Sequence, residues 1–245
     1  MVTTKQYPWQ GIEIPDALRM TGVDLPLVQF VHDGGIFDPR QKTGGFFMPA
    51  RWDTLIRGER VTGRFSGGDE EGVFTTVLSL VPVAWVKTWF DEDGNVLEEY
   101  QEGASSRLRL LALATTPDRR VFWFVLSVHG TASQDLEAAL RQHTQAAAKV
   151  GGQPWMFRLV LQAGTPRRTE KGATVTPITT RPLAPEKAFV GEATCRFIIE
   201  HVGLIGEWRD EGRMSAFPRV VSYHDLQNGG KGQGPRAEED EELDY

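Results

Sequence analysis

The stretch that most constrains the fold is residues 73–90, VFTTVLSLVPVAWVKTWF. It is rich in β-branched and aromatic residues, which favour the pleated surface of a sheet, and it predicts one long strand. The pair Asp93-Gly94 follows. Because both central residues of a type I′ turn need a positive φ, this pair predicts a hairpin. Two further apolar stretches, residues 105–116 and 119–130, predict a second strand pair joined by a turn that contains proline.

The hydrophobic period changes in residues 131–150, TASQDLEAALRQHTQAAAKV. Apolar side chains recur there at the spacing of one helix face, which predicts one well-defined helix. Thr131 or Ser133 is the expected N-cap, and Gly151 is expected to end the helix. A weaker helix is predicted at about residues 185–208, where each of three glycines costs roughly 1 kcal/mol.

Strands are predicted again at residues 154–164 and 172–180. The order of strands, helix and strands predicts a mainly β (α+β) fold, an OB-like five-stranded Greek-key barrel with added strands. A generic α+β sheet with helices on one face is the alternative. The expected organisation is an N-terminal extension packing on the core (1–72), an OB-like nucleic-acid-binding core (73–182), a helical C-terminal element (183–225) and a disordered linker with an acidic tail (226–245).

The net charge of −6 is concentrated at the C-terminal end. Residues 237–245 carry six acids, so the remaining 27 acidic residues balance the 27 lysines and arginines. A neutral body argues against a strongly basic nucleic-acid binder, but it is compatible with a local basic groove. Residues 226–245 have almost no apolar content, which predicts that they are disordered.

Alternation along residues 73–90 predicts two different strand faces. One face is an apolar core face, with Leu78, Leu80, Ala84, Val86 and Phe90. The other face carries two indoles with an ammonium group between them, in the set Val83, Trp85, Lys87 and Trp89. This second face is the candidate surface for a ligand. The alternative is that Trp85 and Trp89 are core residues with Lys87 at the rim.

Cations lie opposite apolar residues in two further strands. Arg107 and Arg109 alternate with leucines, and Arg158 lies between Phe157 and Leu159. The loop TPRRTEKGA adds Arg167, Arg168 and Lys171, although such a loop is also a common solvated hairpin tip. Single-stranded nucleic acid needs aromatic rings for its bases and cations for its phosphates. The sequence therefore predicts a single-stranded DNA site made of Trp85, Lys87, Trp89, Arg107, Arg109, Arg158, Arg167, Arg168 and Lys171.

The C-terminal end resembles that of bacterial and phage single-stranded DNA-binding proteins. A Gly/Gln/Pro linker precedes an acidic tip with a terminal aromatic residue, formed by Glu238, Glu239, Asp240, Glu241, Glu242, Asp244 and Tyr245. Bacterial tips of this family usually end in Phe after Pro, whereas this chain ends in Tyr. The resemblance implies a protein of replication or recombination, of phage or mobile-element type. It also implies that the tip binds replication or repair proteins and competes with DNA for the groove.

Motifs of several other function classes are missing from the sequence. It contains no G-x-S-x-G elbow, Walker loop or H-E-x-x-H motif, so we expect a protein that is not an enzyme, with no metal or cofactor. The single cysteine, Cys195, is expected to be a buried thiol. No membrane-spanning stretch or signal pattern is found, which predicts a cytoplasmic protein. A sheet that binds sugar or a protein subunit, an enzyme with a dispersed site, and an oligomeric state all stay open.

Overall fold

In the computed structural model, the described chain covers residues 25–200 and 220–222. The gaps within it are residues 39, 51–55, 66–67, 92–95, 98–99, 116–119 and 170–171. The predicted turn at Asp93-Gly94, Lys171, and the whole linker and acidic tail therefore lie outside the described residues. Within the described chain the protein is mainly β, as predicted, with few helices.

One curled sheet of eleven strands dominates the described chain. Its order is β12-β9-β5-β7-β8-β1-β2-β4-β3, while β6 pairs with β5 and β13 pairs with β8. The pair β1–β8 is parallel and the neighbouring pairs are antiparallel, so the sheet is mixed. The strands are β1 (Leu27–Val31), β2 (Gly45–Pro49), β3 (Glu59–Phe65), β4 (Gly68–Thr75), β5 (Val77–Phe90), β6 (Val96–Leu97), β7 (Ser105–Thr115), β8 (Arg120–His129), β9 (Leu159–Ala163), β12 (Ile178–Arg181) and β13 (Val220–Ser222).

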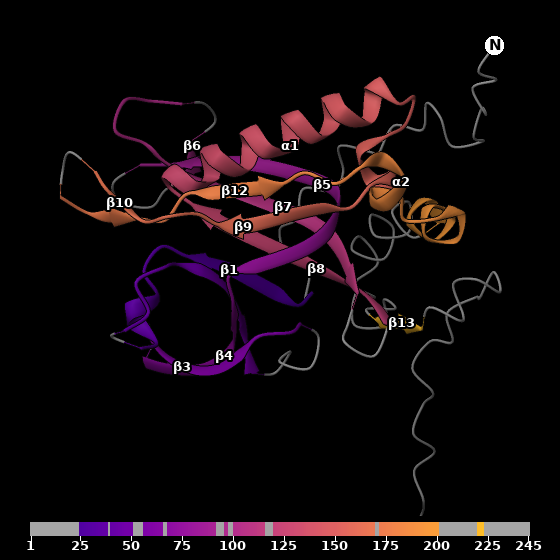
Figure 1. The fold of residues 1–245 in the computed structure, drawn as a ribbon. Coiled ribbons are helices and arrows are strands. Elements are labelled where there is room, and N and C mark those ends of the chain that lie inside the picture. The colour runs from indigo at the N-terminus through magenta and orange to yellow at the C-terminus, as the bar shows by residue number, and fades with distance from the viewer. Residues whose placement is uncertain are drawn as a thin grey trace, which may run out of the picture.

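The sheet curls around one hydrophobic core and carries a second core on its other face (Figure 1). Across the curl, β2 approaches β5 and β9. Helix α1 (Thr131–Lys149) places Leu136 and Leu140 in the inner core, together with Leu108 and Leu110 of β7. The outer core contains Trp123 of β8, covered by the short 3-10 helix η3 (Pro154–Met156) and by helical residues 192–200. Burial of leucine-sized side chains contributes roughly 1.5–3 kcal/mol each.

The predicted helix at residues 131–150 is confirmed, but its cap differs from the expectation. The N-cap is Gly130, whose φ is +59°, and it has no side chain to accept a hydrogen bond. Ser133 Oγ instead donates to the carbonyl of Gly130 at 2.7 Å. The predicted end is confirmed, since Gly151 adopts a φ of +75° directly after the helix.

The helix predicted at about residues 185–208 is interrupted at residues 189–191, and its part beyond residue 200 lies outside the described residues. Helix α2 (Pro185–Ala188) stops at Phe189, which forms an isolated bridge with Phe157, and helical structure resumes only at residue 192. Gly191 has a φ of +88°, which a right-handed helix does not contain. Residues 154–156 likewise form a 3-10 turn that begins with proline instead of the start of a strand.

A β-bulge in β5 overturns the predicted strand faces. Pro82 is opposite Ala112 and Ala84 is opposite Leu111, so Val83 is an extra residue in the ladder. Pro82 lacks the N–H that a regular ladder needs, and proline in a sheet is found mainly at edges and bulges. Beyond the bulge, each residue of β5 therefore projects to the face opposite the one that strict alternation predicts for it.

The bulge changes the neighbours of the predicted aromatic residues. Trp85 is opposite Leu110, a residue of the inner core, and so lies on the face that carries Leu78 and Leu80. Val83 is instead buried in the outer core, and Ala84 packs against that same core. The prediction that grouped Trp85, Lys87 and Trp89 with Val83 is therefore corrected: the three face α1.

Candidate nucleic-acid interface

Four side chains form a partly exposed cluster beside α1, which we call the aromatic platform: Trp85, Lys87, Trp89 and Tyr100. Trp85 is 42 % exposed and Tyr100 is 61 % exposed, and these are the two large aromatic residues classed as exposed in the described chain. The rings of Trp89 and Tyr100 pack edge to face, with centroids 4.9 Å apart. Trp89 is four residue steps along β5 from Trp85, a distance of about 13 Å in a strand.

Lys87 connects the aromatic platform to the helix. Its Nζ lies 4.4 Å from the centre of the Trp89 ring and 2.7 Å from Glu137 Oε2 of α1. The other carboxylate oxygen of Glu137 accepts a hydrogen bond from Arg141 Nη2, also at 2.7 Å. Hydrogen bonds from Lys87 and then from Arg141 lower the pKa of Glu137. Two cations therefore share one carboxylate beside the exposed rings, so these three groups together carry a net positive charge.

Arg107 and Arg109 lie on the opposite face of the sheet. Across β5 and β7, Lys87 is opposite Leu108, whereas Arg107 is opposite Thr88. Directly opposed residues of an antiparallel pair project to the same face, so the arginines and the aromatic platform project to different faces. The predicted alternation of Arg107 and Arg109 with buried leucines is confirmed, but these arginines do not line one groove with the tryptophans.

Contacts on that opposite face hold Arg107 in place. Arg107 Nε donates to His129 Nδ1 at 3.3 Å, and the guanidinium carbon lies 5.1 Å from the centre of the Phe90 ring. Burial, followed by the charge of Arg109, lowers the pKa of Arg107. Burial is also the first cause that lowers the pKa of His129, followed by the charges of Arg107, Arg109 and His32.

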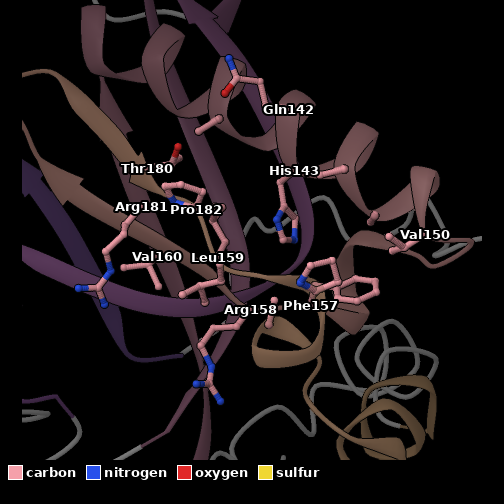
Figure 2. A pocket seen from close by; sticks show the side chains of 16 residues that line it. Gln142, His143, Val150, Phe157, Arg158, Leu159, Val160, Thr180, Arg181 and Pro182 are labelled. Atoms are coloured by element: carbon pink, nitrogen blue, oxygen red, sulfur yellow. The ribbon is translucent and has the colours of Figure 1, made fainter.

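Arg158 lies at the edge of a cavity between α1, β9, β12 and α2 (Figure 2). The cavity has a volume of about 210 Å³ and is lined mainly by alanine, valine, leucine and proline side chains. Figure 2 shows the guanidinium groups of Arg158 and Arg181 pointing away from His143. His143 Nε2 donates to the carbonyl of Pro154 at 2.9 Å, and burial lowers the pKa of this histidine. The cavity is thus mainly apolar, and the histidine that lines it, His143, is hydrogen-bonded to a backbone carbonyl.

Arg167 and Arg168 form β10 (Arg167–Arg168), which pairs with β11 (Thr174–Val175) in a separate two-stranded hairpin. Figure 1 shows β10 at the left edge of the molecule, apart from the main sheet. Both arginines are exposed. The structure thus distributes the predicted cations over four places: the aromatic platform, the opposite face, the cavity edge and this hairpin.

Sequence reasoning missed Tyr100, Glu137, Arg141 and His129. Strand β6 pairs with β5 so that Leu97 is opposite Trp89, and Tyr100 packs on the same Trp89 ring. The predicted hairpin signal implied that the chain returns alongside β5. Glu137 and Arg141 have the i,i+4 spacing of a helical ion pair, which the sequence also contained. Only the packing of α1 on the sheet shows that this pair reaches Lys87.

Metal ligands and the cysteine thiol are the other groups that could carry chemistry. The described residues contain no group of three or more His, Cys, Asp or Glu side chains that could hold a metal ion. Cys195 is fully buried, and burial, followed by the charge of Glu192, raises the pKa of its thiol to about 12. No helix in the described part of the chain is long and apolar enough to cross a membrane.

The chain matches no family model, no curated protein and no solved structure.

Proposed function

We propose that this protein binds single-stranded DNA in replication or recombination, as a cytoplasmic protein of phage or mobile-element type. In this proposal the curled sheet is an OB-like five-stranded core with added strands, and binding involves no catalytic step and no cofactor. The acidic tail recruits replication or repair proteins and shields the cations when DNA is absent.

The observation that carries the proposal is the aromatic platform. Exposing a large aromatic ring costs free energy of hydration, and here Trp85 and Tyr100 are both exposed around the half-buried Trp89. Stacking of a base on such a ring is worth about 1–3 kcal/mol and tolerates any base. Lys87, whose ammonium group lies over the Trp89 ring, and Arg141, which shares the Glu137 carboxylate with Lys87, are the cations proposed to contact the phosphates between stacked bases.

In this proposal the cations have different parts. Lys87, together with Arg141, which the sequence did not single out, contacts phosphates beside bases stacked on the aromatic platform. Arg167 and Arg168, exposed on their hairpin, are suited to phosphates of the same strand farther along. Arg107, Arg109 and Arg158 lie elsewhere on the sheet, so they contact DNA only if the strand passes around its edge.

A sugar ligand would also stack on exposed tryptophan, but it needs free carboxylate or amide groups for its hydroxyls. Glu137, the carboxylate that the described residues place at the aromatic platform, already accepts hydrogen bonds from Lys87 and Arg141 through its two oxygens. This occupancy favours a phosphate-bearing ligand, which would take the cations from Glu137, over a neutral sugar.

The test is equilibrium binding of single-stranded DNA, duplex DNA, RNA and a neutral oligosaccharide to the full chain at two salt concentrations. Single-stranded DNA should bind best, and its affinity should fall with salt with a slope of about −0.7 per phosphate neutralised. Binding that is unchanged between about 50 and 200 mM salt, or that is equal for the oligosaccharide, contradicts the proposal.

A further inference from the structure

A second cationic cluster lies on the face of the sheet opposite the aromatic platform. Arg107 and Arg109 of β7 face His129 and Ser127 of β8 across the ladder. Arg107 is held by two contacts: its Nε donates to His129, and its guanidinium plane lies near the Phe90 ring. These contacts use one edge and one face of the guanidinium, and within the described chain its terminal amino groups remain as a donor fork.

The positive charge of this cluster is not balanced within the described chain. Among the described residues, no carboxylate forms an ion pair with Arg107 or Arg109. Both arginines are half-buried, where a charge costs more than at the surface. A rigid guanidinium fork with a second cation beside it matches the geometry of a tetrahedral oxyanion, which accepts two parallel hydrogen bonds.

We propose that Arg107, Arg109 and His129 form a binding site for a phosphate-type oxyanion, and that the site binds its anion more tightly when His129 is protonated. The site does not depend on the proposed function, because it lies on the other face of the sheet and accepts a free anion without any nucleic acid. Phe90 contributes by holding the Arg107 guanidinium in one plane.

The pH dependence follows from the groups that face His129. Burial comes first and disfavours a positive charge on the His129 ring; Arg107 and Arg109 of β7, and His32 after β1, add to it, so the pKa of His129 is lowered. Near neutral pH the ring is therefore uncharged, and its Nδ1 accepts the hydrogen bond from Arg107 Nε. Protonation turns Nδ1 into a donor, which releases Arg107 Nε. The anion then has a third cation and a further donor within its site.

The linkage is reciprocal, so it can be measured from either side. Every unit by which a bound anion raises the pKa of His129 corresponds to about tenfold tighter anion binding on protonation. Sulfate is the suitable probe because it stays doubly charged over the range in which histidine titrates. Sodium chloride at matched ionic strength controls for screening of the arginines.

The experiment follows the imidazole resonances of His129 by NMR in the full chain, in sulfate and in matched chloride. Sulfate should raise the pKa of His129 by about one unit, and its dissociation constant should rise about tenfold between pH 5 and pH 8. His129→Gln should remove the pH dependence and retain binding, and Arg109→Gln should weaken sulfate by about tenfold. Arg168→Gln, on the separate hairpin, is the matched control and should change neither.

Two competitors then identify the source of the oxyanion. If a thymidine oligonucleotide displaces sulfate from His129, the phosphate of a nucleic acid is the natural ligand. If inorganic phosphate displaces sulfate and the oligonucleotide does not, the ligand is a small free anion. An unchanged His129 titration in sulfate relative to matched chloride overturns the proposal, whatever DNA does at the aromatic platform.

Discussion

Lys87 of β5 and Glu137 of α1 form an ion pair with Nζ and Oε2 2.7 Å apart, and about five sixths of each side chain is buried. The pair joins the helix to the sheet at the aromatic platform. In the free protein, Glu137 therefore engages the ammonium group of Lys87, the residue between Trp85 and Trp89 along β5. A DNA phosphate that reaches Lys87 has to compete with this carboxylate.

Removing the competing carboxylate should strengthen DNA binding. Glu137→Gln frees both Lys87 and Arg141, so affinity for single-stranded DNA should increase at low salt. The salt dependence should become steeper by about 0.7 for each additional phosphate that the freed cations neutralise. Fluorescence anisotropy across a salt series measures both quantities. Glu186→Gln, an exposed change of equal charge on α2, is the control; equal increases in affinity for the two variants would mean that only net charge matters.

The same carboxylate should make stability depend on pH. Because hydrogen bonds from Lys87 and then Arg141 hold the pKa of Glu137 below its ordinary value of 4.5, its stabilising contribution is present above that value. The contribution is lost as the pH falls through the lowered pKa of the folded state. Urea unfolding from pH 6 down to pH 3 should therefore show a smaller loss of stability for Glu137→Gln than for the native chain. Parallel curves for the two proteins contradict this role of the ion pair.

Substitutions of the tryptophans should distinguish rings that bind DNA from rings that stabilise the fold. Trp85→Ala should weaken single-stranded DNA binding by roughly 1–3 kcal/mol with little loss of stability, because its ring is 42 % exposed. Trp89→Ala should weaken binding similarly and also lose the contacts to Lys87 and Tyr100. Trp123→Ala is the comparison for a buried ring and should destabilise the fold by about 3–5 kcal/mol. If Trp85→Ala unfolds the protein while its folded fraction binds DNA normally, Trp85 serves the core alone.

Cys195 should be unreactive in the folded protein. Burial raises the pKa of its thiol to about 12, so almost no thiolate is present near pH 8. Iodoacetamide should label it only after denaturation, with mass spectrometry counting one modified thiol. Because the folded pKa is raised, the stabilisation is complete below the ordinary value of 9.0 and is lost as the pH rises from there towards 12. Rapid labelling without denaturant contradicts the buried placement.

The acidic tail should compete with DNA. Deleting residues 237–245 removes six acids, which a linker as flexible as the sequence predicts would keep at about millimolar effective concentration near the cations. The truncated chain should bind single-stranded DNA more tightly at low salt, and the difference should shrink as salt increases. Removing Tyr245 alone should abolish capture of a replication partner without changing DNA affinity. If the truncated chain binds DNA with unchanged affinity at every salt concentration and captures the same partners, the tail contributes only to solubility.

Local patterns in the sequence predicted much of this architecture. The strand pair β7–β8 and helix α1 lie where periodicity places them, and so does most of the β-branched and aromatic run. The single strand predicted over residues 73–90 is corrected, because residues 73–75 end β4 and β5 begins at Val77. The alternation of Arg107 and Arg109 with buried leucines also follows from the sequence, because β7 has no irregularity between them. Each of these features depends only on the geometry of a single strand, turn or helix.

The aromatic platform and the second cationic cluster depended on tertiary structure. The extra residue Val83 rotates the rest of β5, and this decides that Trp85, Lys87 and Trp89 face α1 while Arg107 faces the other way. Pro82 was the sequence signal for a bulge, but proline does not specify which following residue leaves the ladder. The sequence by itself determined which residues alternate, because alternation is a local property of an extended chain. Only strand register and the packing of α1 decided which face each residue shares, since those depend on contacts between segments far apart in the sequence.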